Sequence, residues 1–318
     1  MSIAPYIKEI GRGKEGARSL NREQAHDLMC QVLDGRVSDL ELGAFAIAMR
    51  IKGESVEELA GFLQATRERC LPIAPGRPLV VLPSYNGARK LPNLTALLAL
   101  MLARAGVAVL VHGMPDDPGR VTTAEIFSHL GLAPAETPGD LQQRWARGEP
   151  AYIRTGHLCP PLARLLDVRW VIGLRNPGHT VAKLLDPGEG LRVVNYTHPE
   201  YGALLTQFLQ ATAAHAMLLR GTEGEPFADP RRTPRMDVFL SGRRLSAWSQ
   251  PAQDGVLDGV PPLPVGCDAR ATAAYIQDVL DGRMPAPDPL RQQVWVLQRA
   301  VQSFCQPEES GHAATHRP

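Results

Sequence analysis

The sequence predicts an α/β protein in which a small N-terminal helical bundle is followed by a larger α/β domain. Within the first 70 residues, three polar caps each precede an apolar segment of helical periodicity. After Pro72, short apolar runs alternate with helical patterns, which is typical of strands in a largely parallel sheet. The chain of 318 residues is long enough for one large domain or two smaller ones.

The helices of the bundle, residues 1–72, begin and end at recognisable signals. Each cap is a short polar residue followed three positions later by Glu or Gln, and the pairs are Asn21 with Gln24, Ser38 with Glu41 and Ser55 with Glu58. Gly35 and Gly53 are placed to end the first two of these helices in a left-handed conformation. A short opening helix is expected near Ile3–Ile10. Because small bundles often complete their core in a second subunit, we expect this to be a dimerisation domain.

The α/β domain is expected over residues 73–305. The predicted strands are Leu79–Leu82, Val107–Val111, Tyr152–Ile153, Val171–Leu174, Leu191–Tyr196, Met217–Leu219 and Val238–Leu240. The predicted helices include Asn93–Ala105, one starting near Thr122, Ala271–Leu280 and Leu290–Phe304. Part of 160–190 is expected to pack with the helical domain, and the polar tail 306–318 is expected to be flexible.

Composition and charge argue against several classes of protein. Lys and Arg total 34 against 33 Asp and Glu, a net charge of +1, which taken alone argues against a strongly basic nucleic-acid binder. No apolar run approaches the ~20 residues that a bilayer span needs, and the N-terminus lacks the apolar core of an export signal. The five cysteines have neither a metal-ligand spacing nor a CxxC pair. We therefore expect a cytoplasmic protein with structural thiols, no metal, no cofactor and no membrane partner.

A glycine motif near the N-terminus has the spacing of a dinucleotide fingerprint. Gly11, Gly13 and Gly16 match GxGxxG. The fingerprint binds a pyrophosphate only where a strand precedes it and a helix opens at its end, and the ten residues before Gly11 have a helical pattern. We therefore expect a loop that joins two helices.

Motifs spread over most of the chain point to one family. They are the helical opening Asn21–Phe62, Pro92-Asn93-Leu94-Thr95, Val111-His112-Gly113, Asp167-Val168-Arg169, Arg175-Asn176-Pro177, Leu185-Asp186-Pro187 and Arg220–Glu225. With these motifs the chain resembles the anthranilate phosphoribosyltransferases of glycosyltransferase family 3. The resemblance implies the nucleoside phosphorylase and phosphoribosyltransferase fold: a helical domain, a larger α/β domain, a cleft at their hinge and a dimer formed through the helical domain.

The sequence departs from that family at two places on which phosphoribosyl transfer depends. The family's GTGGD loop after the first strand is replaced by Pro83–Lys90, whose single glycine is expected to form no pyrophosphate cradle. The family's adjacent Asp-Glu pair for magnesium is replaced by Glu223-Gly224-Glu225, whose carboxylates would diverge on extended backbone. We expect a vestigial transferase site without catalytic residues or metal, and its members are Asn86, Gly87, Asn93, Thr95, His112, Gly113, Glu223 and Glu225.

Arginine dominates the region around the expected cleft. From Arg77 to Arg244 there are 19 Lys and Arg against 14 Asp and Glu, so this region carries +5 and the rest of the chain carries −4. The segments Arg220–Pro226 and Arg232–Arg235 resemble the YbiB-type branch of the family, whose members bind nucleic acid and lack the transferase activity. The expected nucleic-acid contacts are Arg89, Lys90, Arg154, Arg164, Arg169, Arg175, Lys183, Arg220, Arg231, Arg232 and Arg235.

Charge and resemblance together predict a homodimer that binds DNA on an inactive transferase scaffold without reading base sequence, with RNA left open as a second partner. The alternative is a phosphoribosyltransferase with altered substrate and metal contacts, because His112-Gly113 and the two glutamates are retained. Tyr85, Trp170 and Tyr196 are candidates either for base stacking or for ordinary core and rim positions.

Overall fold

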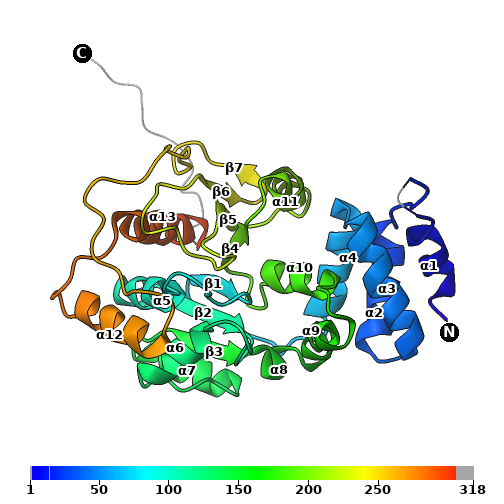
Figure 1. Ribbon diagram of the computed structural model, residues 1–318, viewed down its shortest axis with the longest axis horizontal. Helices are drawn as coiled ribbons and strands as arrows, with labels where there is room; N and C mark the ends of the chain where they lie inside the picture. The colour runs from blue at the N-terminus through cyan, green and yellow to red at the C-terminus, as the bar shows by residue number, and fades with distance from the viewer. Residues whose placement is uncertain (1, 14, 306–318) are drawn as a thin grey trace, which may run out of the picture.

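Figure 1 shows the computed structural model, which describes residues 2–13 and 15–305. The N-terminal helices form a bundle at one end of the molecule, and they are α1 (Ala4–Ile10), α2 (Arg22–Leu33), α3 (Asp39–Lys52) and α4 (Val56–Arg67). No helix in the described ranges is both long and apolar enough to cross a membrane. The tail 306–318, expected to be flexible, lies outside the described residues.

The helix signals of the bundle are confirmed. Asn21, Ser38 and Ser55 each accept a hydrogen bond from the backbone amide three residues on. The Glu or Gln side chain at that position accepts one in turn from the backbone amide of the cap residue. Gly35 (φ 67°) and Gly53 (φ 79°) follow α2 and α3 in conformations that favour glycine. The sequence therefore determines where these helices begin and end.

The α/β domain is built on a seven-stranded sheet in the order β3-β2-β1-β4-β5-β6-β7. The strands are β1 (Leu79–Ser84), β2 (Ala108–Gly113), β3 (Ala151–Arg154), β4 (Leu191–Tyr196), β5 (Ala216–Arg220), β6 (Met236–Leu240) and β7 (Arg243–Arg244). Strands β1 to β5 are parallel, and β6 and β7 are added antiparallel at one edge. The carboxyl ends of the five parallel strands therefore meet along one side of the sheet, which is where ligands bind in such folds.

Helices cover both faces of the sheet. They are α5 (Thr95–Arg104), α6 (Thr123–His129), α7 (Pro138–Ala146), α8 (Thr155–Leu158), α9 (Pro160–Ile172), α10 (Pro177–Leu184), α11 (Glu200–Ala211), α12 (Ala269–Leu280) and α13 (Asp288–Cys305). Figure 1 places α8, α9 and α10 between the sheet and the bundle. Helix α10 contacts α3 and α4 on one side and β1 and β4 on the other, so it connects the two domains.

Two hydrophobic cores fill the molecule, one on each face of the sheet. Along β1, Leu79 and Val81 belong to the first core, whereas Val80 and Leu82 belong to the second. The first core runs from the bundle through α9 and α10 onto the sheet, and the second lies under α5, α12 and α13. Because the first core is continuous across both domains, the cleft between them is held by shared packing.

One predicted strand is wrong. Residues Val171–Leu174 do not form a strand, because α9 continues to Ile172 and ends at Gly173, which has φ 72°. Two prolines at the start of α9 suit the first helical turn, where no amide partner is needed. Val171 is 87% exposed, so this apolar run lies on the solvent side of the helix end and has no place in a buried sheet.

Candidate functional site

The loop after β1 forms a cradle of hydrogen-bond donors, and the carboxylate of Glu225 fills it. The backbone amides of Asn86 and Gly87 each donate to Glu225 Oε1 at 2.7 Å. The hydroxyls of Ser84 and Thr95 donate to Oε2, the latter at 3.2 Å. Glu225 is fully buried; burial raises the pKa of its carboxyl group, and the four hydrogen bonds act in the opposite direction.

Glu223 binds the next part of the same loop. Its Oε2 accepts hydrogen bonds from the backbone amides of Arg89, Lys90 and Leu91 at 3.0, 3.1 and 3.2 Å. Partial burial acts to raise the pKa of Glu223, but the three amides and the nearby Arg120 lower it below its usual range. Backbone amides of the loop after β1 therefore donate to two carboxylates of the same chain.

Two expectations about this region are corrected. Glu223 and Glu225 do not diverge, because Glu223 (φ 52°) and Gly224 (φ 86°) make a tight turn closed by a 2.9 Å bond from the Glu225 amide to the Thr222 carbonyl. The loop also does form a cradle, because the single Gly87 (φ 66°) is enough to bring successive amides onto one acceptor. Its anion is a side chain of the protein.

The His112-Gly113 pair at the end of β2 is part of the buried structure. His112 is fully buried, with Nδ1 2.7 Å from the Tyr85 hydroxyl and Nε2 3.1 Å from the Leu185 carbonyl. Burial lowers the pKa of His112 to about 4, so this imidazole is neutral at physiological pH. Tyr85 is also buried and bonded to Thr155, which excludes it as a stacking platform. Asn93 donates to the Thr123 hydroxyl at 3.0 Å.

Three neighbouring cavities of about 430, 290 and 480 Å³ share lining residues, and together we call them the hinge groove; the first lies between the bundle and the α/β domain, and the other two are lined by the α/β domain alone. Arg175 lines the first and third, His179 the first and second, and Arg169 and Trp170 the second and third. Shared lining residues make them parts of one continuous surface. The third cavity is lined by four arginines, and they are Arg89, Arg120, Arg169 and Arg175.

The arginines of the third cavity are short of negative partners. Arg169 pairs with Asp117 at 3.2 Å, whereas Arg89, Arg120 and Arg175 form no ion pair with any described residue. Burial, followed by repulsion from neighbouring arginines, lowers the pKa of Arg120 and of Arg175. The arginines nevertheless stay charged at neutral pH. A bound anion would relieve their mutual repulsion.

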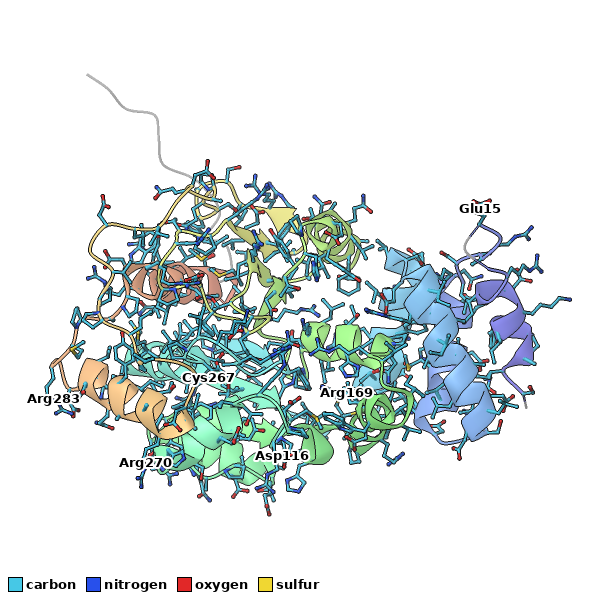
Figure 2. All side chains as sticks on the ribbon, viewed as in Figure 1. Glu15, Asp116, Arg169, Cys267, Arg270 and Arg283 are labelled. Atoms are coloured by element: carbon cyan, nitrogen blue, oxygen red, sulfur yellow. The ribbon has the colours of Figure 1, made fainter. Side chains whose placement is uncertain are left out.

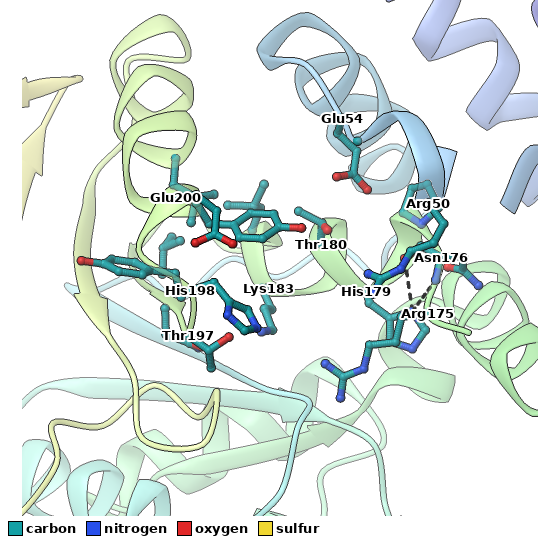
Figure 3. A pocket seen from close by; sticks show the side chains of 18 of the residues that line it. Arg50, Glu54, Arg175, Asn176, His179, Thr180, Lys183, Thr197, His198 and Glu200 are labelled. Atoms are coloured by element: carbon teal, nitrogen blue, oxygen red, sulfur yellow. Dashed lines mark hydrogen bonds between the residues drawn. The ribbon is translucent and has the colours of Figure 1, made fainter. Parts of the chain in front are cut away.

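The 430 Å³ cavity extends the groove between α3, α10 and the end of β4. Figure 3 shows Arg50 and Glu54 of the bundle side facing His198 and Glu200 of the sheet side, with Lys183 between them. Burial, followed by repulsion from Arg175, lowers the pKa of Lys183 to about 8. Asn195 lines this cavity, is 2% exposed, and has neither amide atom bonded to a described group.

The structure brings only part of the predicted basic set together. Arg89, Arg169, Arg175 and Lys183 line the hinge groove. Arg154 and Arg220 are exposed at the carboxyl ends of β3 and β5, on the same side of the sheet but outside the three cavities, as is the exposed Lys90.

The other four predicted contacts have different environments. Arg164 donates to the Leu33 carbonyl at 3.2 Å and so ties α9 to α2. Arg231 pairs with Asp229 at 2.8 Å, and Arg235 pairs with Asp237 at 2.6 Å. Arg232 is exposed and lines none of the three cavities. The charges of Arg231 and Arg235 are therefore paired with aspartates of the protein itself.

Two groove arginines are not among the expected nucleic-acid contacts. Arg50 stands at the end of α3, next to the Gly53 turn, and Arg120 lies between β2 and α6. Arg120 donates to the Gly87 carbonyl at 3.2 Å, which attaches it to the loop after β1. No local pattern marks either residue, because each reaches the groove only through the tertiary fold. Arg50 does lie within the helical opening Asn21–Phe62 on which the family resemblance rests.

A helical bundle, a mixed α/β sheet and a groove at their hinge are the architecture of glycosyltransferase family 3, and the chain belongs to this family. Residues 4–70 match the family model described as the helical bundle domain of a glycosyl transferase family. The chain is 40% identical to the uncharacterized protein YbiB of Escherichia coli, over 99% of this chain and 96% of that protein.

More distant relatives are named as enzymes. Anthranilate phosphoribosyltransferase 2 of Ralstonia nicotianae is 26% identical, over 86% of this chain and 80% of its own. The crystal structure of anthranilate phosphoribosyltransferase from Thermus thermophilus superposes with a TM-score of 0.70, 23% identity and coverage of 93% and 88%. The Saccharomyces cerevisiae enzyme in complex with PRPP and Mg gives a TM-score of 0.67, 12% identity and coverage of 95% and 89%. These two structures establish the fold alone.

Proposed function

We propose that this protein binds the phosphate backbone of DNA or RNA in the hinge groove, without reading base sequence, on a transferase scaffold that no longer binds diphosphate. One observation carries the proposal. The carboxylates of Glu223 and Glu225 occupy the anion cradle of the scaffold, while three groove arginines have no acidic partner among the described residues.

The filled cradle argues against phosphoribosyl transfer. A diphosphate entering the loop after β1 would have to displace Glu225 from four hydrogen bonds and leave a buried carboxylate unpaired. The neighbouring Glu223 would repel the same anion. His112, a retained family residue, is neutral and satisfied within the core.

The groove arginines have the properties that a phosphate backbone needs. Their guanidinium groups present planar pairs of donors, and each phosphate they neutralise releases condensed counterions. Trp170 is half exposed beside them, with the Arg169 guanidinium 4.1 Å from its ring centroid. Such an aromatic ring can accept a stacked base whatever its identity. Few base-edge contacts are available, so affinity should depend on phosphate and salt.

A salt titration tests the proposal. Fluorescence anisotropy of labelled single-stranded DNA, duplex DNA and RNA is measured from about 50 to 200 mM salt, and the logarithm of the affinity should fall linearly with the logarithm of the salt concentration. Oligonucleotides of different base sequence should bind alike. Weak binding, or binding indifferent to salt, would overturn the proposal. In parallel, calorimetry with phosphoribosyl pyrophosphate and Mg²⁺ should detect no binding; magnesium-dependent binding would favour the transferase alternative.

We also propose that the protein is a homodimer through α3. Leu40, Ile47 and Ile51 are exposed on one face of this helix, at 84%, 37% and 64%, and apolar side chains at such spacing favour a facing helix. Size-exclusion chromatography with light scattering should find a dimer. Ile51→Asp should produce monomers, whereas Val256→Asp, at a similarly exposed apolar site outside α3 (60% against 64%), should not. A monomeric wild-type protein would contradict this proposal.

A further inference from the structure

A cluster of three potential metal ligands lies on the helical domain, outside the hinge groove. His26 and Cys30 are one turn apart on α2, and Glu68 follows the last residue of α4. His26 Nε2 is 2.9 Å from Glu68 Oε2 and 3.7 Å from Cys30 Sγ. The three ligand atoms all lie within 4.8 Å of one another.

Close helix packing brings these residues together. Gly61 of α4 faces α2 so closely that a Cβ there would stand 2.7 Å from the His26 amide nitrogen and 2.4 Å from the Arg22 carbonyl oxygen. A larger residue at 61 would separate α4 from the turn of α2 that carries His26. The approach of the two helices therefore sets the distance between the His26 ring and the carboxylate that follows α4.

The spacing of the three atoms fits one tetrahedral ion. Zinc–ligand bonds of about 2.0 Å to nitrogen or oxygen and about 2.3 Å to sulfur put tetrahedral N and O ligands about 3.3 Å apart, and N and S ligands about 3.5 Å apart. The observed separations of 2.9 and 3.7 Å are within about 0.4 Å of these values. Because Cys30 Sγ also lies 3.8 Å from His26 Nδ1, the imidazole or the Cys30 side chain must turn so that Nε2 and the thiolate face one ion.

We infer that His26, Cys30 and Glu68 form a binding site for a thiolate-preferring divalent transition metal of the Zn²⁺ class. A thiolate, an imidazole and a carboxylate are the donors that such ions select, whereas Mg²⁺ and Ca²⁺ prefer oxygen alone. No fourth protein ligand joins the cluster among the described residues, so water completes the coordination.

Neighbouring side chains orient the Glu68 carboxylate and hold the nearby Arg69 guanidinium. Gln64 Nε2 donates to Glu68 Oε1 at 3.2 Å and orients the carboxylate. Arg69 lies near, 3.7 Å from Glu68 Oε2, but its guanidinium is held by Asp34 at 2.6 and 3.0 Å and by the Ala65 carbonyl at 2.7 Å. On metal binding, the metal–sulfur bond forms as the Cys30 S–H bond breaks, and the proton leaves to water. His26 keeps its remaining proton on Nδ1.

Cobalt is a direct probe of the site. The full-length reduced protein, stripped of metal with a chelator, is titrated with Co²⁺, and a thiolate-to-cobalt charge-transfer band should grow to one equivalent and disappear on addition of Zn²⁺. Cys30→Ser should abolish the band, and His26→Gln or Glu68→Gln should weaken cobalt binding at least tenfold. Cys267→Ser, a half-buried thiol of the other domain, is the matched control and should bind as the wild type does.

Circular dichroism checks that each variant is folded. If Cys30→Ser does not fold, His26→Gln and Glu68→Gln give the same test, because both side chains are substantially exposed. No charge-transfer band in the wild type would overturn the inference. So would a band that persists in Cys30→Ser, or wild-type affinity in both other ligand variants.

Discussion

Single residues decide which anions this protein can hold. Glu225 accepts four hydrogen bonds from the loop after β1 and the residues that flank it. A carboxylate can accept all four on its two oxygens, whereas an amide side chain has only one oxygen acceptor. Arg120 and Arg175, a short distance away, lack acidic partners among the described residues. The same scaffold therefore has its anion cradle satisfied internally and its cationic groove left free.

Glu225→Gln tests the internal anion. The amide nitrogen of Gln would face either the two hydroxyls or the two backbone amides, and the donors on that side would lose their carboxylate acceptor, which costs about 1–3 kcal/mol. Urea unfolding should show this loss in the free energy of unfolding. Glu136→Gln, at an exposed position on the surface, should change the stability little. Equal stability of the two variants would contradict the role given to Glu225.

Under the proposed binding of nucleic acid in the hinge groove, Lys183 should make the affinity depend on pH. Its pKa is lowered to about 8 by burial and by Arg175, so the free protein loses this charge as the pH rises from 7 to 9. A bound phosphate favours the charged form, and the affinity should therefore be higher at pH 7 than at pH 9. Anisotropy titrations of the wild type and of Lys183→Arg at both pH values check this. An equal decline in the variant, whose guanidinium stays charged, would assign the effect to another group.

At the scale of elements, the tight turn Thr222–Glu225 determines where the carboxylates of Glu223 and Glu225 lie. Glu223 and Gly224 both have positive φ, which points the two carboxylates at one loop. A side chain on Gly224 would also collide with Asn86. The turn thus determines which groups fill the cradle.

Gly224→Ala should therefore destabilise the protein by more than about 1 kcal/mol, through backbone strain and displacement of the loop. Gly139→Ala is the matched control: it lies in the first turn of α7 and would meet only the Thr137 hydroxyl, at an ordinary 3.6 Å. Thermal unfolding of both variants, followed by circular dichroism, gives the comparison. A Gly224→Ala protein as stable as the control would contradict this account of the turn.

Local sequence signals predicted the elements well and the site only partly. The capping boxes mark α2, α3 and α4 because cap and acceptor are three residues apart in the chain. The Val171–Leu174 error arose because an apolar run at an exposed helix end has the composition of a strand. The direction of the Glu223 and Glu225 side chains was predicted wrongly because the segment was assumed to be extended, whereas Glu223 and Gly224 have positive φ angles. The groove arginines come from four separate segments, whose meeting only the tertiary fold determines.

At the scale of the whole molecule, a net charge of +1 conceals an uneven distribution. The bundle and the sheet pack together through α9 and α10, and this shared packing fixes the shape of the hinge groove. Arginines without an ion-pair partner among the described residues line its third cavity. Elsewhere arginines form ion pairs with nearby aspartates, as Arg231 does with Asp229 and Arg235 with Asp237. The position of the arginines, and not the total charge, is therefore what supports the proposed phosphate-rich partner.

The most direct test compares two double variants of equal charge. Arg120→Ala/Arg175→Ala removes two groove cations, and Arg270→Ala/Arg283→Ala removes two cations on and beside α12, which Figure 2 places far from Arg169. In a salt titration with single-stranded DNA, the groove variant should bind more weakly, with a slope of log affinity against log salt reduced by about 1.4, or about 0.7 for each lost phosphate contact. The α12 variant should match the wild type. Equal affinities and slopes in the two variants would contradict nucleic-acid binding in the hinge groove.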